Sequence, residues 1–494
     1  MAVHAAGQHD RLTVHGGHRL VDLQGFCGPT YVSQSLLASP ERCINRYPEL
    51  IESPAAKHRV ALYPCPGFAS FATLLASPTR ALHEEQDRLW AVGGASLFEV
   101  SSVGTPTART TTMATDSNPA TLCSSGDFSN DLMATSGDQV YIMDLTTNVV
   151  TNPTGNVTMG GYVDGYFLGL DVDTSTLRIS ELADPATWTQ TAQRSAGADR
   201  WVSLFVNHRE IWLFGSKTSE VWYNAGTSPF PFLLYPGSFM EQGCAASFSP
   251  AALDNTVVWL GRDKGGRCVV WRAAGYRPQR ISTHAIEYAL QGFTTVSDAI
   301  GWSYQDQGHS FYVLHFPTED RTFVYDAATQ LWHERLYWNT TTGEWEAYRA
   351  IYHAFAFNRH IVGDRDGAGL YEMAIDQYAD IGGGPLRWLR QGPMIDADGH
   401  WLTWQDVEFE LEPGVGLATG QGSDPQVMFR YSRDGGFTWS NMRYLPIGAM
   451  GNYDTRAISR NMGRGRRFVP ELSGSDPVPF RIVGARGTFL KGAR

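Results

Sequence analysis

The chain has 494 residues, of which 43% are hydrophobic and 18% charged, and its formal net charge is −11. This composition excludes an intrinsically disordered chain, and the acidic balance argues against a protein that coats nucleic acid, which would be basic. Glycine (51), proline (25) and 12% aromatic residues indicate many turns and packed strands rather than helices.

The N-terminal part of the chain, residues 1–80, is irregular, rich in proline and poor in periodicity. We expect it to form an arm or docking segment. Its first ten residues, MAVHAAGQHD, lack a basic stretch followed by an apolar one, so no signal peptide is expected. Six cysteines without a C-x-x-C pair indicate reduced, buried thiols made in a cytoplasm rather than a zinc site. They are Cys27, Cys43, Cys65, Cys123, Cys244 and Cys268.

A repeated unit occupies the middle of the chain: an apolar strand, a Gly or Asp turn and a second strand. A period of about 45 residues with paired strands is typical of β-propeller blades. Seven copies predict six or seven blades in a propeller domain spanning residues 81–394. They start at Leu89, Leu132, Tyr166, Ile211, Val257, Phe311 and His360.

Helical signals are sparse. The best candidate is STHAIEYALQGF (282–293), which has apolar residues at Ile286, Ala289 and Leu290. The expected fold class is therefore all-β, with a central β-propeller-like repeat domain.

A separate antiparallel, β-sandwich-like domain is expected from residue 395 to residue 494. LTWQDVEFELEPGVG alternates with a period of two at Val407, Phe409 and Leu411, as a half-buried strand does. The GGG at 382–384 is a plausible joint before it.

This C-terminal domain contains one full match to the pattern S-x-D-x-G-x-T-W, known as the Asp-box from sialidases and other carbohydrate-cleaving propellers. Its fixed residues are Ser432, Asp434, Gly436, Thr438 and Trp439. Asp and Gly favour a tight turn, and the apolar flanks favour a β-hairpin. We interpret the box as structural, with its polar residues tying the turn and Trp439 anchoring the second strand in a core.

Catalytic and metal-binding motifs are not visible. A glycosidase needs two carboxylates across the scissile bond, or a Tyr–Glu pair with an arginine cluster, and no motif nominates such a set. DRDG (364–367) resembles the start of a calcium loop, but Glu372 comes too early to close it. We therefore expect no enzyme activity, no cofactor and no small-molecule substrate; the alternative is an Asp-box propeller glycosidase of sialidase-like or polysaccharide-degrading type.

One basic cluster stands out in RNMGRGRRF (460–468), which contains Arg460, Arg464, Arg466 and Arg467. The planar guanidinium group of arginine can donate two parallel hydrogen bonds to a carboxylate or phosphate group. Three interpretations remain open: a solvated loop, a docking surface for an acidic protein neighbour, and a contact to the DNA backbone.

Several segments, in order, resemble the tail accessory proteins of short-tailed bacteriophages, also called packaged-DNA stabilisation, hub or nozzle proteins. These segments are ERCINRYPELIES (41–53), VALYPCPGF (60–68), FVYDAATQLWHER (323–335), HIVGDRDGAGLYEM (360–373), DVEFELEPGVG (406–416), the SRDGGFTW hairpin and GRGRRFVPELSGSDPVPFRIVGA (463–485). The resemblance covers most of the chain and supplies no catalytic residues.

The resemblance implies a structural virion protein that forms a ring of six copies below the portal and adaptor proteins. Such a ring would extend the DNA channel, help to retain packaged DNA and take part in ejection. The implied partners are other copies of the chain, the portal and adaptor, other tail proteins (needle, plug, fibre or spike), and DNA passing without sequence-specific binding. The implied location is the short tail of a virion assembled in the host bacterial cytoplasm.

Overall fold

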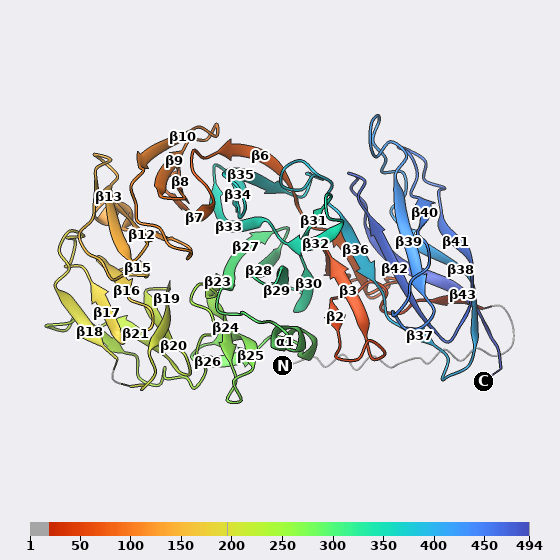
Figure 1. Cartoon of the computed structure of the whole chain (residues 1–494), viewed down its shortest axis with the longest axis horizontal. Coiled ribbons are helices and arrows are strands. Elements are labelled where there is room, and N and C mark those ends of the chain that lie inside the picture. The colour runs from red at the N-terminus through yellow and green to blue at the C-terminus, as the bar shows by residue number, and fades with distance from the viewer. Residues whose placement is uncertain (1–18, 195, 494) are drawn as a thin grey trace. The chain divides into compact units, whose positions relative to one another are not determined.

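The computed structural model describes residues 19–194 and 196–493. It is an all-β protein, with 2% helix and 52% strand, which confirms the expected fold class. Its contacts define two compact units (Figure 1). The propeller unit contains residues 66–331 and 335–384, and the sandwich unit contains the described residues up to Cys65 together with 332–334 and 385–493.

The propeller unit contains seven antiparallel blades among its described residues. The first four blades are β7 (Thr79–Glu85), β8 (Arg88–Gly93), β9 (Ser96–Val100) and β10 (Pro106–Thr110); β11 (Thr121–Ser124), β12 (Asp131–Ser136), β13 (Gln139–Asp144) and β14 (Val150–Thr151); β15 (Met159–Val163), β16 (Tyr166–Leu170), β17 (Thr176–Ile179) and β18 (Gln190–Gln193); β19 (Trp201–Asn207), β20 (Glu210–Gly215), β21 (Ser219–Asn224) and β22 (Phe232–Leu234).

The other three blades complete the ring (Figure 1). They are β23 (Ala251–Leu253), β24 (Thr256–Arg262), β25 (Cys268–Ala274) and β26 (Arg277–Arg280); β27 (Ile300–Asp306), β28 (His309–Phe316) and β29 (Arg321–Asp326); β33 (Ala350–Ala356), β34 (Arg359–Asp364), β35 (Gly369–Ala374) and β6 (Gly67–Thr73). A hairpin of β31 (Leu336–Asn339) and β32 (Glu344–Ala347) joins the sixth blade to the seventh.

Each of the seven predicted repeats is the hairpin between the second and third strands of one blade. The copy starting at Leu89 spans β8 and β9, and the copy starting at His360 spans β34 and β35. These two strands are buried between neighbouring blades and therefore have the most regular apolar pattern. The structure thus fixes the blade number, which the sequence left at six or seven, at seven.

The ring is closed by a strand from the N-terminal part of the chain. Strand β6 pairs antiparallel with β35, with Gly67 opposite Ala374 and Thr73 opposite Gly369. The seventh blade therefore takes its outer strand from one end of the propeller sequence and its other three from the opposite end. This pairing joins the first and last blades by backbone hydrogen bonds, which opposes opening of the ring.

Hydrophobic clusters fill the spaces between neighbouring blades. Trp90 of the first blade packs in one cluster with Leu132 of the second, and Met133 of the second packs with Phe167 of the third. All four side chains are fully buried or nearly so. Each blade is therefore stabilised mainly by its two neighbours.

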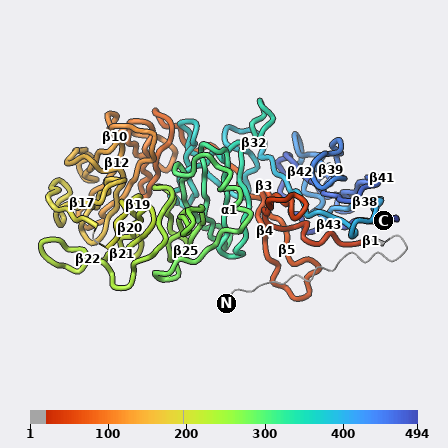
Figure 2. The backbone as a smooth tube through the Cα atoms, turned by 60° about the horizontal axis from the view of Figure 1, so that its bottom comes forward, coloured from red at the N-terminus to blue at the C-terminus, as the bar shows by residue number. Residues whose placement is uncertain are grey.

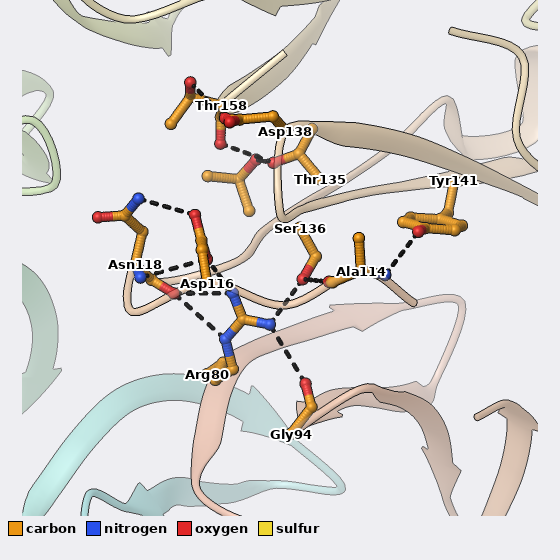
Figure 3. A network of polar contacts seen from close by, with 11 residues as sticks. Arg80, Gly94, Ala114, Asp116, Asn118, Thr135, Ser136, Asp138, Tyr141 and Thr158 are labelled. Carbon is orange, nitrogen blue, oxygen red and sulfur yellow. Dashed lines mark hydrogen bonds and ion pairs between the residues drawn. The ribbon is translucent and has the colours of Figure 1, made fainter. Parts of the chain in front are cut away.

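A buried arginine also links the first two blades. Figure 3 shows the guanidinium of Arg80, on β7, surrounded by hydrogen-bond acceptors from both blades and their connection. It donates to Ser136 Oγ (2.6 Å), Asp116 Oδ1 (2.7 Å) and the carbonyls of Asn118 (2.8 Å) and Gly94 (3.2 Å). Because its donors are satisfied by partners from two blades, Arg80 fixes their relative position.

The predicted helix is confirmed as α1 (His284–Gln291). The Oγ1 of Thr283 accepts a hydrogen bond from the backbone N–H of Ile286, as an N-cap residue does. Ile286 and Leu290 are buried and hold the helix against the propeller, while Ala289 is half-buried. A short 3₁₀ helix, η1, covers Gly126–Phe128.

The sandwich unit contains two sheets that enclose one core. One sheet comprises β4 (Arg46–Leu50), β5 (Val60–Pro64), β43 (Ile482–Lys491), β38 (Leu402–Leu411), β41 (Ala457–Gly465) and β1 (Arg19–Asp22). The other comprises β2 (Tyr31–Val32), β3 (Pro40–Ile44), β30 (Leu331–Glu334, of which 332–334 belong to this unit), β36 (Trp388–Gln391), β37 (Ile395–Asp396), β42 (Arg467–Gly474), β39 (Gln426–Ser432) and β40 (Arg443–Pro446).

The structure divides the chain differently from the expected segments 1–80, 81–394 and 395–494. Residues 19–65 belong to the sandwich unit, whereas residues 66–80 belong to the propeller. Strand β1 pairs with β43, the red and blue segments that lie together in Figure 2, and β3 pairs with β36. The N-terminal segment lacks periodicity because its short strands complete sheets whose other strands are distant in sequence. The signal-peptide prediction concerns residues outside the described range.

Buried arginines attach this N-terminal segment to the sandwich core. Arg390, which is fully buried, donates to Glu41 Oε2 (2.7 Å) and to the backbone carbonyls of Gly25 (2.8 Å) and Pro29 (2.9 Å). The guanidinium of Arg46 lies 4.4 Å from the centre of the Phe480 ring. Residues 19–65 of the segment that we expected to form an arm or docking segment are thus part of the chain's own sandwich.

A buried carboxyl in the propeller unit predicts a pH-dependent stability. Burial raises the pKa of Asp380 to about 7, although the N–H of Ile381 and the charge of Arg349 lower it. As the pH rises from about 4 to above 7, the unfolded chain loses this proton before the folded one does. We therefore expect the free energy of unfolding to fall by roughly 1–4 kcal/mol over this range.

Urea unfolding at several pH values tests this prediction. Asp380→Asn should remove this part of the pH dependence, whereas Asp376→Asn, at an exposed position, should preserve it. Equal pH profiles for wild type and Asp380→Asn would contradict the assignment.

Candidate functional site

The Asp-box forms the turn that follows β39 in the sandwich unit. The carboxylate of Asp434 accepts hydrogen bonds from the backbone N–H groups of Phe437 (3.0 Å) and Thr438 (2.9 Å), and from the hydroxyls of Ser432 (2.7 Å) and Thr438 (2.5 Å). Ser432 Oγ in turn accepts from the N–H of Gly436 at 2.8 Å. The polar residues of the box tie the turn, so its geometry is that of a structural motif.

Trp439 does not anchor the second strand in the core, and this expectation was wrong. The second strand, β40, begins only at Arg443, so Trp439 lies in the loop before it and is half-buried. The guanidinium of Arg430 lies 4.8 Å from the centre of the Trp439 ring, and it also pairs with Glu471. Trp439 therefore covers an ion pair on the sheet surface instead of filling the core.

The Asp-box carboxylate should stabilise the fold only while it is ionised. Burial raises the pKa of Asp434, but hydrogen bonds from Thr438, Ser432 and the backbone outweigh this effect and lower the pKa to about 2. The stabilisation is therefore complete above the ordinary pKa of 3.8 and is lost as the pH falls towards 2. Asp434→Ala should lower the free energy of unfolding by about 1–3 kcal/mol at pH 7.

Chemical unfolding of both proteins measures this effect, and the difference should shrink on acidification to pH 2. Asp424→Ala, a change outside the box, should alter stability by less than about 0.5 kcal/mol. A difference that persists at pH 2 would show that the charge of Asp434 is not the cause.

The arginine segment lies where β41 turns into β42. Arg460 and Arg464 are on β41, Arg466 is in the connection, and Arg467 begins β42. All four are exposed, whereas Met462 between them is buried in the core. Within the described residues none of the four guanidinium groups forms a salt bridge, so their charges are available to a partner.

Two of these arginines share one aromatic ring. The guanidinium carbons of Arg464 and Arg466 lie 4.6 and 4.8 Å from the centre of the Trp401 ring. Such cation–π contacts hold the side chains in place and reduce the conformational entropy lost on binding. No sequence pattern pairs Trp401 with a segment some 60 residues away; the register of β38 with β41 brings them together. We call Trp401, Arg460, Arg464, Arg466 and Arg467 the arginine face.

The axis of the propeller contains a cavity of about 500 Å³ lined by the inner strands of the blades. His83 lies there with its Nε2 3.4 Å from Ser124 Oγ and 3.9 Å from Glu85 Oε2. In a serine–histidine–carboxylate relay, the carboxylate holds the ring nitrogen that faces away from the serine. Here the serine and the carboxylate face the same nitrogen, and Ser124 donates directly to Glu85, so the cluster is not such a relay.

The acidic turn at 364–367 connects β34 and β35, and its carboxylates are paired with arginines. Asp364 contacts Arg349 at 2.5 Å, and Asp366 contacts Arg365 at 2.8 Å. Over residues 19–194 and 196–493, no three His, Cys, Asp or Glu side chains are grouped as a metal site requires. No described helix is long and apolar enough to cross a membrane.

Two family models match the chain in the order of its two units. The model described as Bacteriophage P22 Gp10, beta-propeller, matches residues 42–378, and the model described as Bacteriophage P22 Gp10, beta-sandwich, matches residues 387–488. The chain belongs to the bacteriophage P22 Gp10 family. As a member of the P22 Gp10 family it is a structural protein of a phage tail, and the resemblance noted in the sequence is confirmed.

Solved structures similar to this P22 Gp10 family member include the N-terminal domain of Nup159 (11% identity, TM-score 0.40, covering 67% of this chain and 98% of that one). A streptogramin B lyase is similar to the same extent, with 8% identity and a TM-score of 0.42, covering 63% of this chain and 97% of that one. So is a chain of the mitotic checkpoint complex, with 11% identity and a TM-score of 0.41, covering 66% of this chain and 96% of that one. At these TM-scores the likeness carries no argument about function. No curated protein matches the sequence.

Proposed function

We propose that six copies of the chain form a ring below the portal and adaptor proteins of a short phage tail. The ring extends the DNA channel, helps to retain the packaged DNA and takes part in its ejection. Other tail proteins, such as a needle, plug, fibre or spike, bind to it, and DNA passes without sequence-specific contacts. Membership of a phage tail family supports this proposal.

The arginine face is the observation that carries the assembly part of the proposal. Two exposed arginines held on one tryptophan, neither of which forms a salt bridge in the described chain, form a preorganised cationic surface. Arginine is enriched at protein interfaces, where its planar fork binds carboxylates through two hydrogen bonds. A chain with a net charge of −11 that lines a DNA channel repels phosphate, so its arginines are better suited to protein partners.

Electron microscopy of the purified protein and of isolated virions tests the ring. We expect closed rings with six-fold symmetry in both samples, with the virion ring located below the portal. Purified protein that remains monomeric at high concentration, together with virion tails lacking a six-fold layer of this protein, would contradict the proposal.

A structural role also predicts that the purified protein releases no sugar from the surface polysaccharide of the host. The Asp-box is on the sandwich and ties a turn, and the cluster at His83 lacks relay geometry. Reducing-sugar assays should give the same signal for wild type and for Glu85→Gln, which changes the carboxylate that contacts Ser124 and His83 at the axial cavity. Release of sugar that disappears in Glu85→Gln would favour the glycosidase alternative.

A further inference from the structure

The two units of the chain carry opposite net charges. The propeller unit contains 19 Lys and Arg against 33 Asp and Glu, a net charge of −14, whereas the rest of the chain contains 20 against 17, a net charge of +3. Charge complementarity between two regions of one chain favours head-to-tail contacts between copies over contacts between like regions.

One part of the propeller surface combines acidic and exposed apolar side chains. Phe128 and Leu182 are 61% and 55% exposed, and a Cβ built on Gly165 would lie 2.9 and 2.7 Å from them, so the two side chains converge. Asp127 is adjacent to Phe128, and Asp184 follows Leu182 closely. We call Asp87, Asp127, Phe128, Leu182 and Asp184 the acidic rim.

The loops of the acidic rim are held together across blades, and their charges are free. Gln86, on the first blade, donates to Asp127 (3.2 Å) and to Asn130 (3.0 Å) on the second. In the described chain none of the three rim carboxylates forms a salt bridge. The nearby guanidinium of Arg209 pairs with Asp164 at 2.6 Å, so it does not neutralise the rim.

The arginine face has the complementary composition. The Asp-box loop lies beside it, because the N–H of Gly435 donates to the carbonyl of Arg467 at 3.0 Å. This loop presents Phe437, which is 67% exposed. A cationic surface with an exposed aromatic side chain therefore faces outward from the sandwich.

The sheet edge at this surface is unsuited to binding another strand. β41 is the last strand of its sheet, but Asn461 and Gly463 have φ angles of 60° and 83°. Left-handed residues interrupt the extended ladder of N–H and C=O groups that strand addition requires. Binding at this edge must therefore use side chains.

We propose that the arginine face of one copy docks on the acidic rim of the next copy in the ring. Arg464 and Arg466 pair with the carboxylates of Asp127 and Asp184, and Phe437 packs against Phe128 and Leu182. This heterologous contact repeats from copy to copy and closes into the ring. The inference rests on the proposed ring and names the two surfaces that meet in it.

The test uses two charge-reversed variants of the full chain. The rim variant carries Asp127→Arg and Asp184→Arg; Asp87 is retained because its φ of 57° disfavours most replacements. The face variant carries Arg464→Glu and Arg466→Glu. In mass photometry, the fraction of protein in rings should be at least roughly tenfold smaller for each variant alone than for the wild type.

An equimolar mixture of the two variants should recover rings. In a ring of six in which the variants alternate, the basic face of the rim variant meets the acidic rim of the face variant. At the other contacts, the glutamates of the face variant meet the arginines of the rim variant. Every contact therefore joins opposite charges. A control with Glu344→Arg and Asp376→Arg makes the same change in charge at exposed sites outside the rim and should still form rings. Thermal melting confirms that each variant is folded.

The outcomes separate the docking contact from the ring itself. If either variant alone forms as many rings as the wild type, or if the mixture does not recover rings, the proposed contact is wrong. The proposed ring itself is not contradicted by these outcomes. Loss of binding to a double-stranded DNA fragment in the face variant, with rings intact in both variants, would assign the arginine face to DNA. Wild-type protein that stays monomeric, together with virion tails that lack a six-fold layer of it, would overturn both proposals.

Discussion

Replacing Arg194 with alanine should lower the free energy of unfolding by about 3–5 kcal/mol. Arg194 follows β18 of the third blade and pairs with Glu220 on β21 of the fourth, and each side chain is only 1% exposed. The guanidinium also donates to Thr218 Oγ1 (2.6 Å) and to the carbonyl of Asp199 (2.8 Å). Alanine would leave the carboxylate of Glu220 buried without its counter-ion, which is the costly step.

Thermal and urea unfolding measure this loss. Arg200→Ala, a nearby exposed position, should change stability by less than about 0.5 kcal/mol. Replacing both partners, Arg194→Leu with Glu220→Leu, should recover much of the loss because no unpaired charge remains. A cost below about 1 kcal/mol for Arg194→Ala would show that the pair does not hold these two blades together.

Replacing Arg464, Arg466 and Arg467 with alanine should prevent tail assembly while leaving the subunit folded. Truncating one interfacial arginine typically costs about 1–3 kcal/mol, and the loss repeats at each contact around the ring. The three side chains are exposed and form no salt bridge within the described chain, so the fold loses only the contacts with Trp401. Folded protein should therefore accumulate free of virions, and heads should leak DNA.

Electron microscopy of virions and a nuclease-protection assay of the packaged DNA measure this outcome. A matched variant carries Arg262→Ala, Arg267→Ala and Arg277→Ala, which removes three exposed arginines from the fifth blade, and it should assemble normally. Complete tails and retained DNA in the Arg464, Arg466 and Arg467 variant would show that the arginine face is not a subunit contact.

The sequence by itself determined the fold class and the element types because these depend on local patterns. The seven repeated hairpins, the first starting at Leu89 and the last at His360, are buried between blades. Burial requires apolar residues at regular positions, and this periodicity can be recognised in the sequence. The helix at His284–Gln291 and the turn of the Asp-box were also predicted, since capping and turn chemistry act over a few residues.

The tertiary structure alone decided how the chain is divided and which side chains meet. β6 joins the seventh blade, and residues 19–65 join the sandwich, through backbone pairing between segments hundreds of residues apart. Trp401 meets Arg464 and Arg466 because of the register of β38 with β41, and Trp439 leaves the core because β40 begins after it. Such pairings depend on long-range packing and register, for which a single sequence carries no local signal.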